Sequence, residues 1–88
     1  MSKVNVTIKF FSTIACEAGC KETELRVSSK LITALEEIER ATNSNLYLQL
    51  QQGRISLLVN GRSVKLNIQE NILKDGDTLA FLPIMGGG

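Results

Sequence analysis

The sequence predicts an α+β domain in which one main helix covers one face of a mixed sheet of four to five strands. Segments of alternating apolar and polar residues lie at both ends of the chain, and such alternation is typical of half-buried strands. Between them, residues 31–42 carry apolar side chains at helical spacing. No repeat, linker or low-complexity stretch interrupts the 88 residues, so we expect a single domain.

The first half of the chain predicts strand, short helix and strand. Alternation in residues 4–10 involves the apolar side chains Val4, Val6, Ile8 and Phe10. Residues 11–18 carry apolar side chains three and four residues apart, starting at Phe11, which predicts a short helix or helical loop that ends at Gly19. Alternation resumes in residues 22–27 and predicts a second strand, antiparallel to the first.

The main helix follows, with Ser28 and Ser29 as its expected N-cap. Its predicted apolar face consists of Leu31, Leu35, Ile38 and Thr42, with Ile32 and Ala34 beside it. Glu36, Glu37 and Arg40 lie away from that face, and we expect them to be solvated.

The second half predicts a short helical turn over residues 46–52 and then a strand over residues 55–59. Leu58 interrupts the alternation of this strand, and apolar side chains on both faces favour a central position. Asn60-Gly61 indicates a type I′ turn, and Val64, Leu66 and Ile68 continue as the returning strand or extended segment.

The last predicted elements are a turn at Asp75-Gly76-Asp77 and a strand over residues 78–82, after which Pro83 ends strand pairing. We expect the first and last strands to be neighbours in the middle of the sheet. The final strand would then direct the C-terminus away from the body of the domain.

Composition and charge exclude several classes of function. The net charge is +1 without a basic block, which argues against nucleic acid or an anionic membrane as partner. No apolar run reaches the ~18 residues of a membrane span, and no secretory signal is recognisable, so we expect a cytoplasmic protein. Cys16 and Cys20 are predicted to be free thiols, and without histidine they cannot complete a zinc site. We therefore expect no metal.

The chain lacks the parts of an enzyme. It has no histidine to act as a base and no glycine-rich loop between a strand and a helix. Neither cysteine has an obvious activating partner, and Asp75 and Asp77 are expected to be turn formers.

The C-terminus offers a different kind of reactive group. Gly86, Gly87 and Gly88 follow the last predicted strand with nothing after them. They form a thin tail that can thread a narrow channel in another protein and present its carboxylate there. We expect residues 84–88 to be a flexible tail behind a domain of residues 1–83, because glycines have no side chains to pack.

Several segments resemble the ubiquitin-like sulfur carriers. They are Lys9-Phe10-Phe11, Val59-Asn60-Gly61, Asp75-Gly76-Asp77 and Phe81-Leu82-Pro83 before the terminal glycines. The chain is most similar to MoaD, the small subunit of molybdopterin synthase, and to the small archaeal modifier proteins, with ThiS more distant. The resemblance covers nearly the whole chain and implies a ubiquitin-like β-grasp fold.

The resemblance also implies a chemistry. An E1-like enzyme would use ATP to adenylate the carboxylate of Gly88, and sulfur transfer would give a thiocarboxylate. The large subunit of molybdopterin synthase would then use this sulfur in molybdenum or tungsten cofactor synthesis. In modifier proteins the activated glycine instead acylates a lysine of a target protein. The carrier itself would bind no cofactor, catalyse nothing and be a monomer when free.

Carriers of this type typically end in two glycines, and here Gly88 is one residue more. Counted from the end of the chain, the reacting pair is Gly87-Gly88; counted from Pro83, it is Gly86-Gly87. We prefer the first count, because the chemistry takes place at the terminal carboxylate.

Partner docking is expected on an apolar patch beside the tail. Alternation predicts that Leu79 and Phe81 face the helix and Leu82 the opposite side of the sheet. Leu58 is out of phase with its strand and should share that outer side, with Ile84 and Met85 extending the patch. One alternative concerns the patch: single exposed apolar residues are common on protein surfaces and need no partner. The other concerns the function: the chain is then a β-grasp interaction domain whose glycines take part in no C-terminal chemistry.

Overall fold

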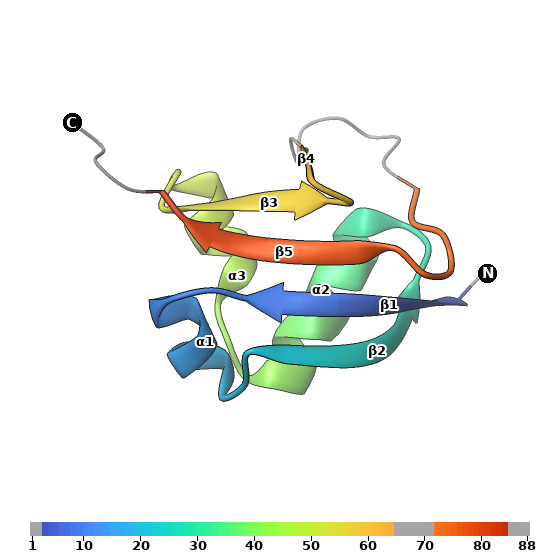
Figure 1. The fold of residues 1–88 in the computed structure, drawn as a ribbon, viewed down its shortest axis with the longest axis horizontal. Coiled ribbons are helices and arrows are strands. Elements are labelled where there is room, and N and C mark those ends of the chain that lie inside the picture. The colour runs from blue at the N-terminus through green and yellow to red at the C-terminus, as the bar shows by residue number, and fades with distance from the viewer. Residues whose placement is uncertain (1–2, 65–71, 85–88) are drawn as a thin grey trace.

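The computed structural model describes residues 3–64 and 72–84. Figure 1 shows two layers, with a sheet in front and helix α2 behind it. The strands of the described chain are β1 (Lys3–Phe10), β2 (Glu22–Ser28), β3 (Ile55–Val59), β4 (Arg62–Ser63) and β5 (Thr78–Pro83). Its helices are α1 (Thr13–Ala18), α2 (Leu31–Thr42) and α3 (Leu46–Gln51). The predicted mixed sheet with one main helix on one face is therefore confirmed.

The first and last strands are neighbours in the middle of the sheet, as predicted. The strand order is β2-β1-β5-β3-β4, with β1 and β5 parallel and every other pair antiparallel. Phe10, the last residue of β1, lies opposite Phe81 of β5. Because parallel strands run in the same direction, β1 and β5 both end at one end of the sheet, on the left in Figure 1.

The core lies between the inner face of the sheet and α2. Alternation in the strands places every second side chain in this core, and α2 contributes four buried apolar residues: Leu31, Ala34, Leu35 and Ile38. The rings of Phe10 and Phe81 stack in this core, with ring centroids 5.6 Å apart. Ile32, expected beside the apolar face of α2, is instead 39% exposed.

The expected N-cap of α2 is wrong. Lys30 is the residue at the cap position and its side chain makes no capping hydrogen bond. Ser28 is the last residue of β2 and pairs with Lys3 of β1, so it lies too early in the chain to cap α2. Its hydroxyl oxygen instead accepts a hydrogen bond from the backbone N–H of Lys30, 3.1 Å away.

The two predicted turns are confirmed. Asn60 and Gly61 both have positive φ, 52° and 83°, as a type I′ turn requires. Gly76 has φ 87°, and the carboxylate of Asp75 accepts a hydrogen bond from the backbone N–H of Asn5. Asp77 accepts one from the side-chain amide of Asn60, so the aspartates join the turn to the sheet. Of the predicted returning strand, residues 65–71, with Leu66 and Ile68, lie outside the described residues.

Glu37 is only partly solvated, with its side chain 24% exposed, and it makes contacts that the sequence did not predict. One carboxylate oxygen accepts a hydrogen bond from the backbone N–H of Ser28 at 2.7 Å, and the other pairs with the ammonium group of Lys3. The hydrogen bond from Lys3, and then that from Ser28, lower the pKa of Glu37 below its ordinary value of 4.5. The side chain thus ties α2 to β1 and β2.

Replacing Glu37 with Ala is expected to lower the free energy of unfolding by about 1–2 kcal/mol at pH 7, because the N–H of Ser28 loses its partner. A depressed folded-state pKa contributes stability above the unfolded pKa, and this contribution is lost as the pH falls through the folded pKa. Urea titrations from pH 7 to pH 3 should therefore show the two proteins converging below pH 4.5. A Glu37→Gln variant keeps an acceptor and should lose less; an equal loss would contradict this role of the carboxylate.

Candidate carrier tail and docking face

The root of the tail, residues 81–84, pairs with neighbouring segments of the chain on both sides. Pro83, at the end of β5, lies opposite Ile55 of β3, and the backbone N–H of Ile84 donates to the carbonyl oxygen of Arg54 at 3.0 Å. On the other side, the N–H of Phe11 donates to the carbonyl oxygen of Phe81 at 3.2 Å. The chain therefore leaves the sheet from a fixed point at the end of β5.

The reacting residues proposed from the sequence come after that point. Met85, Gly86, Gly87 and Gly88 lie outside the described residues. The structure gives the point from which they start: Ile84, which precedes them, follows the central strand β5 at the end of the sheet where β1 also ends. Figure 1 shows this end of β5 on the left, at the opposite end of the sheet from the N-terminus.

Leu58 and Leu82 lie on the outer face of the sheet, away from α2. Leu58 is paired with Ala80, and Leu82 with Ser56, so these four residues project from the same side of two neighbouring strands. We call them the docking face. Both leucines are half-buried, less exposed than the sequence suggested, and Ile84 beyond them is 49% exposed.

Phe11 lies next to this face, although its spacing predicts that it belongs to the helical segment of residues 11–18. The helix α1 begins only at Thr13, and its buried residue is Ile14. Phe11 is 42% exposed and is bonded through its backbone to Phe81, next to Leu82. Continuing the alternation of β1 by one residue would have placed it on the outer face.

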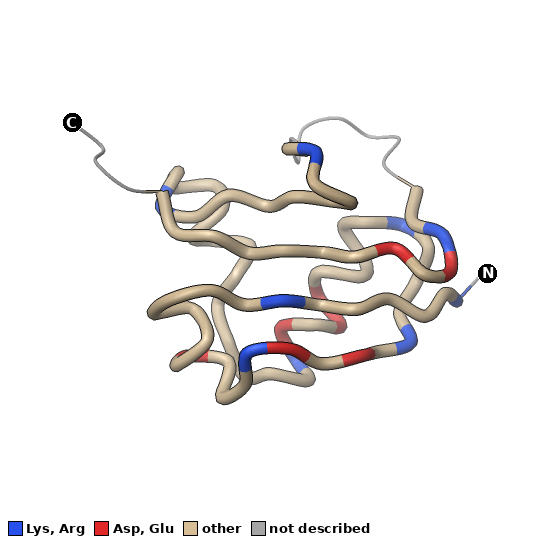
Figure 2. The backbone as a smooth tube through the Cα atoms, in the orientation of Figure 1, with Lys and Arg blue, Asp and Glu red and all other residues tan. Residues whose placement is uncertain are grey.

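Charge divides the outer face into two halves. Lys9 of β1 lies opposite Glu22 of β2, and Thr7 opposite Glu24, so this half carries charged side chains. Residues 55–59 of β3 and 78–83 of β5 include no charged side chain; the coloured stretches that Figure 2 shows at the start of these strands are Arg54 and Asp77, the residues directly before them. The uncharged half is the one beside the tail, and it suits contact with an apolar surface of another protein.

The described residues hold no group of acidic or cysteine side chains that could bind a metal ion. Cys16 is exposed and Cys20 half-buried, both as free thiols. No helix in the described part of the chain is long and apolar enough to cross a membrane.

The mixed sheet with α2 across one face is that of a ubiquitin-like β-grasp protein. The model of the ThiS family matches residues 8–88, and the chain belongs to this family of ubiquitin-like sulfur carriers. None of the curated proteins matches it.

Solved structures confirm the fold. Small archaeal modifier protein 1 from Methanosarcina acetivorans is 26% identical, with a TM-score of 0.80 and full coverage of both chains. A putative molybdopterin converting factor subunit 1 from Pyrococcus furiosus is 24% identical, with a TM-score of 0.71 over 91% of this chain and 97% of that one. Subunit 1 in a complex with subunit 2 of the molybdopterin-converting factor from Helicobacter pylori 26695 is 21% identical, with a TM-score of 0.61 over 97% of this chain and all of that one.

Proposed function

We propose that this protein is a sulfur carrier of molybdenum or tungsten cofactor synthesis, whose Gly88 carboxylate is activated by an E1-like enzyme in the cytosol. The observation that carries the proposal is the run Gly86-Gly87-Gly88, which begins two residues after the end of a central strand, in a chain of the ThiS family. Molybdopterin converting factor subunits among the similar structures support this branch of the family.

The proposed chemistry has two steps, both in partner enzymes. A carboxylate is a poor electrophile until one of its oxygens becomes part of a good leaving group. An oxygen of Gly88 would bond to the α-phosphorus of ATP, and pyrophosphate would leave. A hydrosulfide-level sulfur nucleophile would then attack the acyl carbon and expel AMP, leaving a thiocarboxylate. The carrier only delivers the group, and glycine gives the narrowest chain for entry into the partner's active site.

A second function is favoured by a separate observation. Small archaeal modifier protein 1 matches over the whole chain at the highest TM-score of the structures described above. In that role the activated Gly88 would form an isopeptide bond to a lysine of a target protein, and AMP would leave without sulfur transfer. Both functions share the adenylation step and differ in the nucleophile that follows.

Mass spectrometry of the protein from its native cells separates the two functions. A sulfur carrier is expected to show intact chains in which one oxygen of the Gly88 carboxyl group is replaced by sulfur. A modifier is expected to give tryptic peptides in which Gly88 is joined to a lysine of another protein. An unmodified C-terminus under all growth conditions would reject both and leave a β-grasp interaction domain.

Replacing Leu82 with Asp is expected to weaken binding to the E1-like enzyme more than tenfold. A buried apolar anchor in an interface typically contributes about 2 kcal/mol or more, and a carboxylate there would be desolvated without a partner. Isothermal titration calorimetry gives the affinity. The fold should survive, because Leu82 projects away from the core.

Thr33→Asp, at an exposed position of α2 in the other layer, is the matched control and should bind normally. Normal binding by Leu82→Asp, or loss of its folded circular dichroism spectrum, would show that the docking face has been assigned wrongly.

A further inference from the structure

A hollow of about 800 Å³ lies beside α1, at the turn into β2. Apolar atoms of Phe10, Phe11 and Ala15 line it together with Cys16 and Cys20. Lys9, Lys21 and Glu22 also line it, with two positive charges against one negative. A mainly apolar hollow with a net positive charge among its lining residues suits an apolar side chain flanked by carboxylates.

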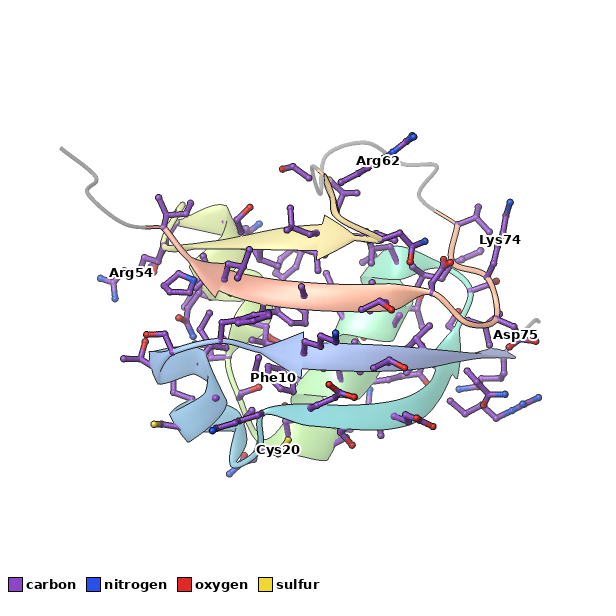
Figure 3. All side chains as sticks on the ribbon, in the orientation of Figure 1. Phe10, Cys20, Arg54, Arg62, Lys74 and Asp75 are labelled. Carbon is purple, nitrogen blue, oxygen red and sulfur yellow. The ribbon has the colours of Figure 1, made fainter. Side chains whose placement is uncertain are left out.

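The hollow and the root of the tail lie at the same end of the sheet. Phe10 pairs with Phe81, and the N–H of Phe11 bonds to the carbonyl oxygen of Phe81. Lys9 lies opposite Ala80 of the docking face. Figure 3 shows Phe10, Cys20 and Arg54 toward this end, with Arg54 beside the last residues of β5. The hollow thus continues the docking face across β1.

The length of the tail limits where a partner can bind. Residues 85–88 follow Ile84, and at about 3.3 Å per residue they reach about 13 Å when extended. An enzyme that encloses Gly88 must therefore come close to the root of the tail. An interface of standard size buries about 800 Å² on each partner, which is roughly a disc of 16 Å radius. An interface of this size, centred on the root of the tail, would extend across the sheet beyond β5 and β1.

We propose that the E1-like enzyme places an apolar side chain in this hollow, so that Cys16 of α1 forms part of the surface that it covers. The inference rests on the proposed activation of Gly88 and adds a second contact, on the far side of β1 from Leu58. An acidic residue of the enzyme beside that side chain would meet Lys9 or Lys21.

Cys16 allows a direct test. Cys16 is exposed on α1, so a small maleimide should modify it in the free protein. A saturating amount of the E1-like enzyme is expected to slow this modification more than tenfold. Cys16→Arg, which fills the hollow with a charged side chain, is expected to raise the Kd for the enzyme at least tenfold. Cys16→Ser should bind as the unmodified chain does.

Ala41→Arg is the matched control, because Ala41 is exposed on α2, in the layer behind the sheet. It should bind normally and have the same thermal midpoint as Cys16→Arg. Normal binding by Cys16→Arg, or equal losses in the two arginine variants, would overturn the proposed contact. So would sedimentation showing that Cys16→Arg abolishes self-association only, since the occupant would then be a second copy of this chain.

A separate measurement distinguishes failure of the proposed function from failure of this inference. Pyrophosphate exchange measures adenylation of the unmodified chain without reference to the hollow. If the E1-like enzyme does not adenylate Gly88 at all, the proposed function and this inference are both overturned. If it adenylates the unmodified chain and Cys16→Arg with the same KM, only the inference is.

Discussion

A chain that lacks Gly87 and Gly88 is expected to lose ATP-dependent activation completely, while its thermal midpoint stays nearly unchanged. The deletion withdraws the carboxylate by about 7 Å, which removes the reacting atom from the active site of the E1-like enzyme. A misplacement of 1 Å can already cost a hundredfold in rate. The anchoring of the tail root involves Ile84 and Arg54, upstream of the deletion, so folding should not suffer.

Pyrophosphate exchange measures activation of the shortened chain, and thermal unfolding of the same preparation measures its thermal midpoint.

The deletion of Gly88 alone decides which pair of glycines reacts. If register is counted from the end, the shortened chain should be activated poorly; if counted from Pro83, Gly86-Gly87 should react normally. A large fall in the thermal midpoint on removing Gly87 and Gly88 would mean that the tail is structural and would contradict a delivery role.

Local patterns predicted most of this fold, because each is enforced by a short-range constraint. A strand with one face in the core has alternating residues, so β1, β2 and β5 could be recognised directly. Asn60-Gly61 has the positive φ values of its turn, and Gly19, at φ 79°, ends α1 in the left-handed conformation. The central pairing of β1 and β5 followed from the order of the elements.

The predictions that differ from the structure concern residues whose contacts are made with distant parts of the chain. Ser28 carries the side chain of a good N-cap, yet its pairing with Lys3 keeps it in the sheet. Glu37 has the spacing of a surface residue of α2, and only the position of β1 and β2 against the helix gives it partners. Sequence spacing alone does not contain these contacts.

The predictions for the candidate site likewise depend partly on local patterns and partly on how distant segments pair. Alternation placed Leu58 and Leu82 on one side of the sheet, but only the register shows that they lie on neighbouring strands beside Ala80. Phe11 was missed because its helical spacing to Ile14 competed with the alternation of β1. The glycines proposed to react, Gly86, Gly87 and Gly88, were recognised from the sequence as an unexplained run; they lie outside the described residues, so their role stays a prediction.

Phe81 gives the second large expected effect. Its side chain is fully buried, its ring stacks on that of Phe10, and its strand is the root of the tail. Truncation to Ala is expected to cost about 3–5 kcal/mol, including the loss of the aromatic pair. A domain of 88 residues has about 4–13 kcal/mol of total stability, so much or all of it would be lost.

The measurement is thermal unfolding followed by circular dichroism, where about 4 kcal/mol corresponds to a fall of roughly 15–30 °C in Tm for a domain of this size. Phe81→Leu, which retains most of the buried volume, should lose far less. Phe81→Ala leaves every residue of the tail and docking face in the chain. At temperatures below its own Tm, where the variant is folded, the E1-like enzyme should therefore activate it. Failure of the folded variant to be activated would mean that stacking at Phe81 also sets the direction in which the tail leaves the sheet, whereas an unchanged Tm would contradict the packing of this ring in the core.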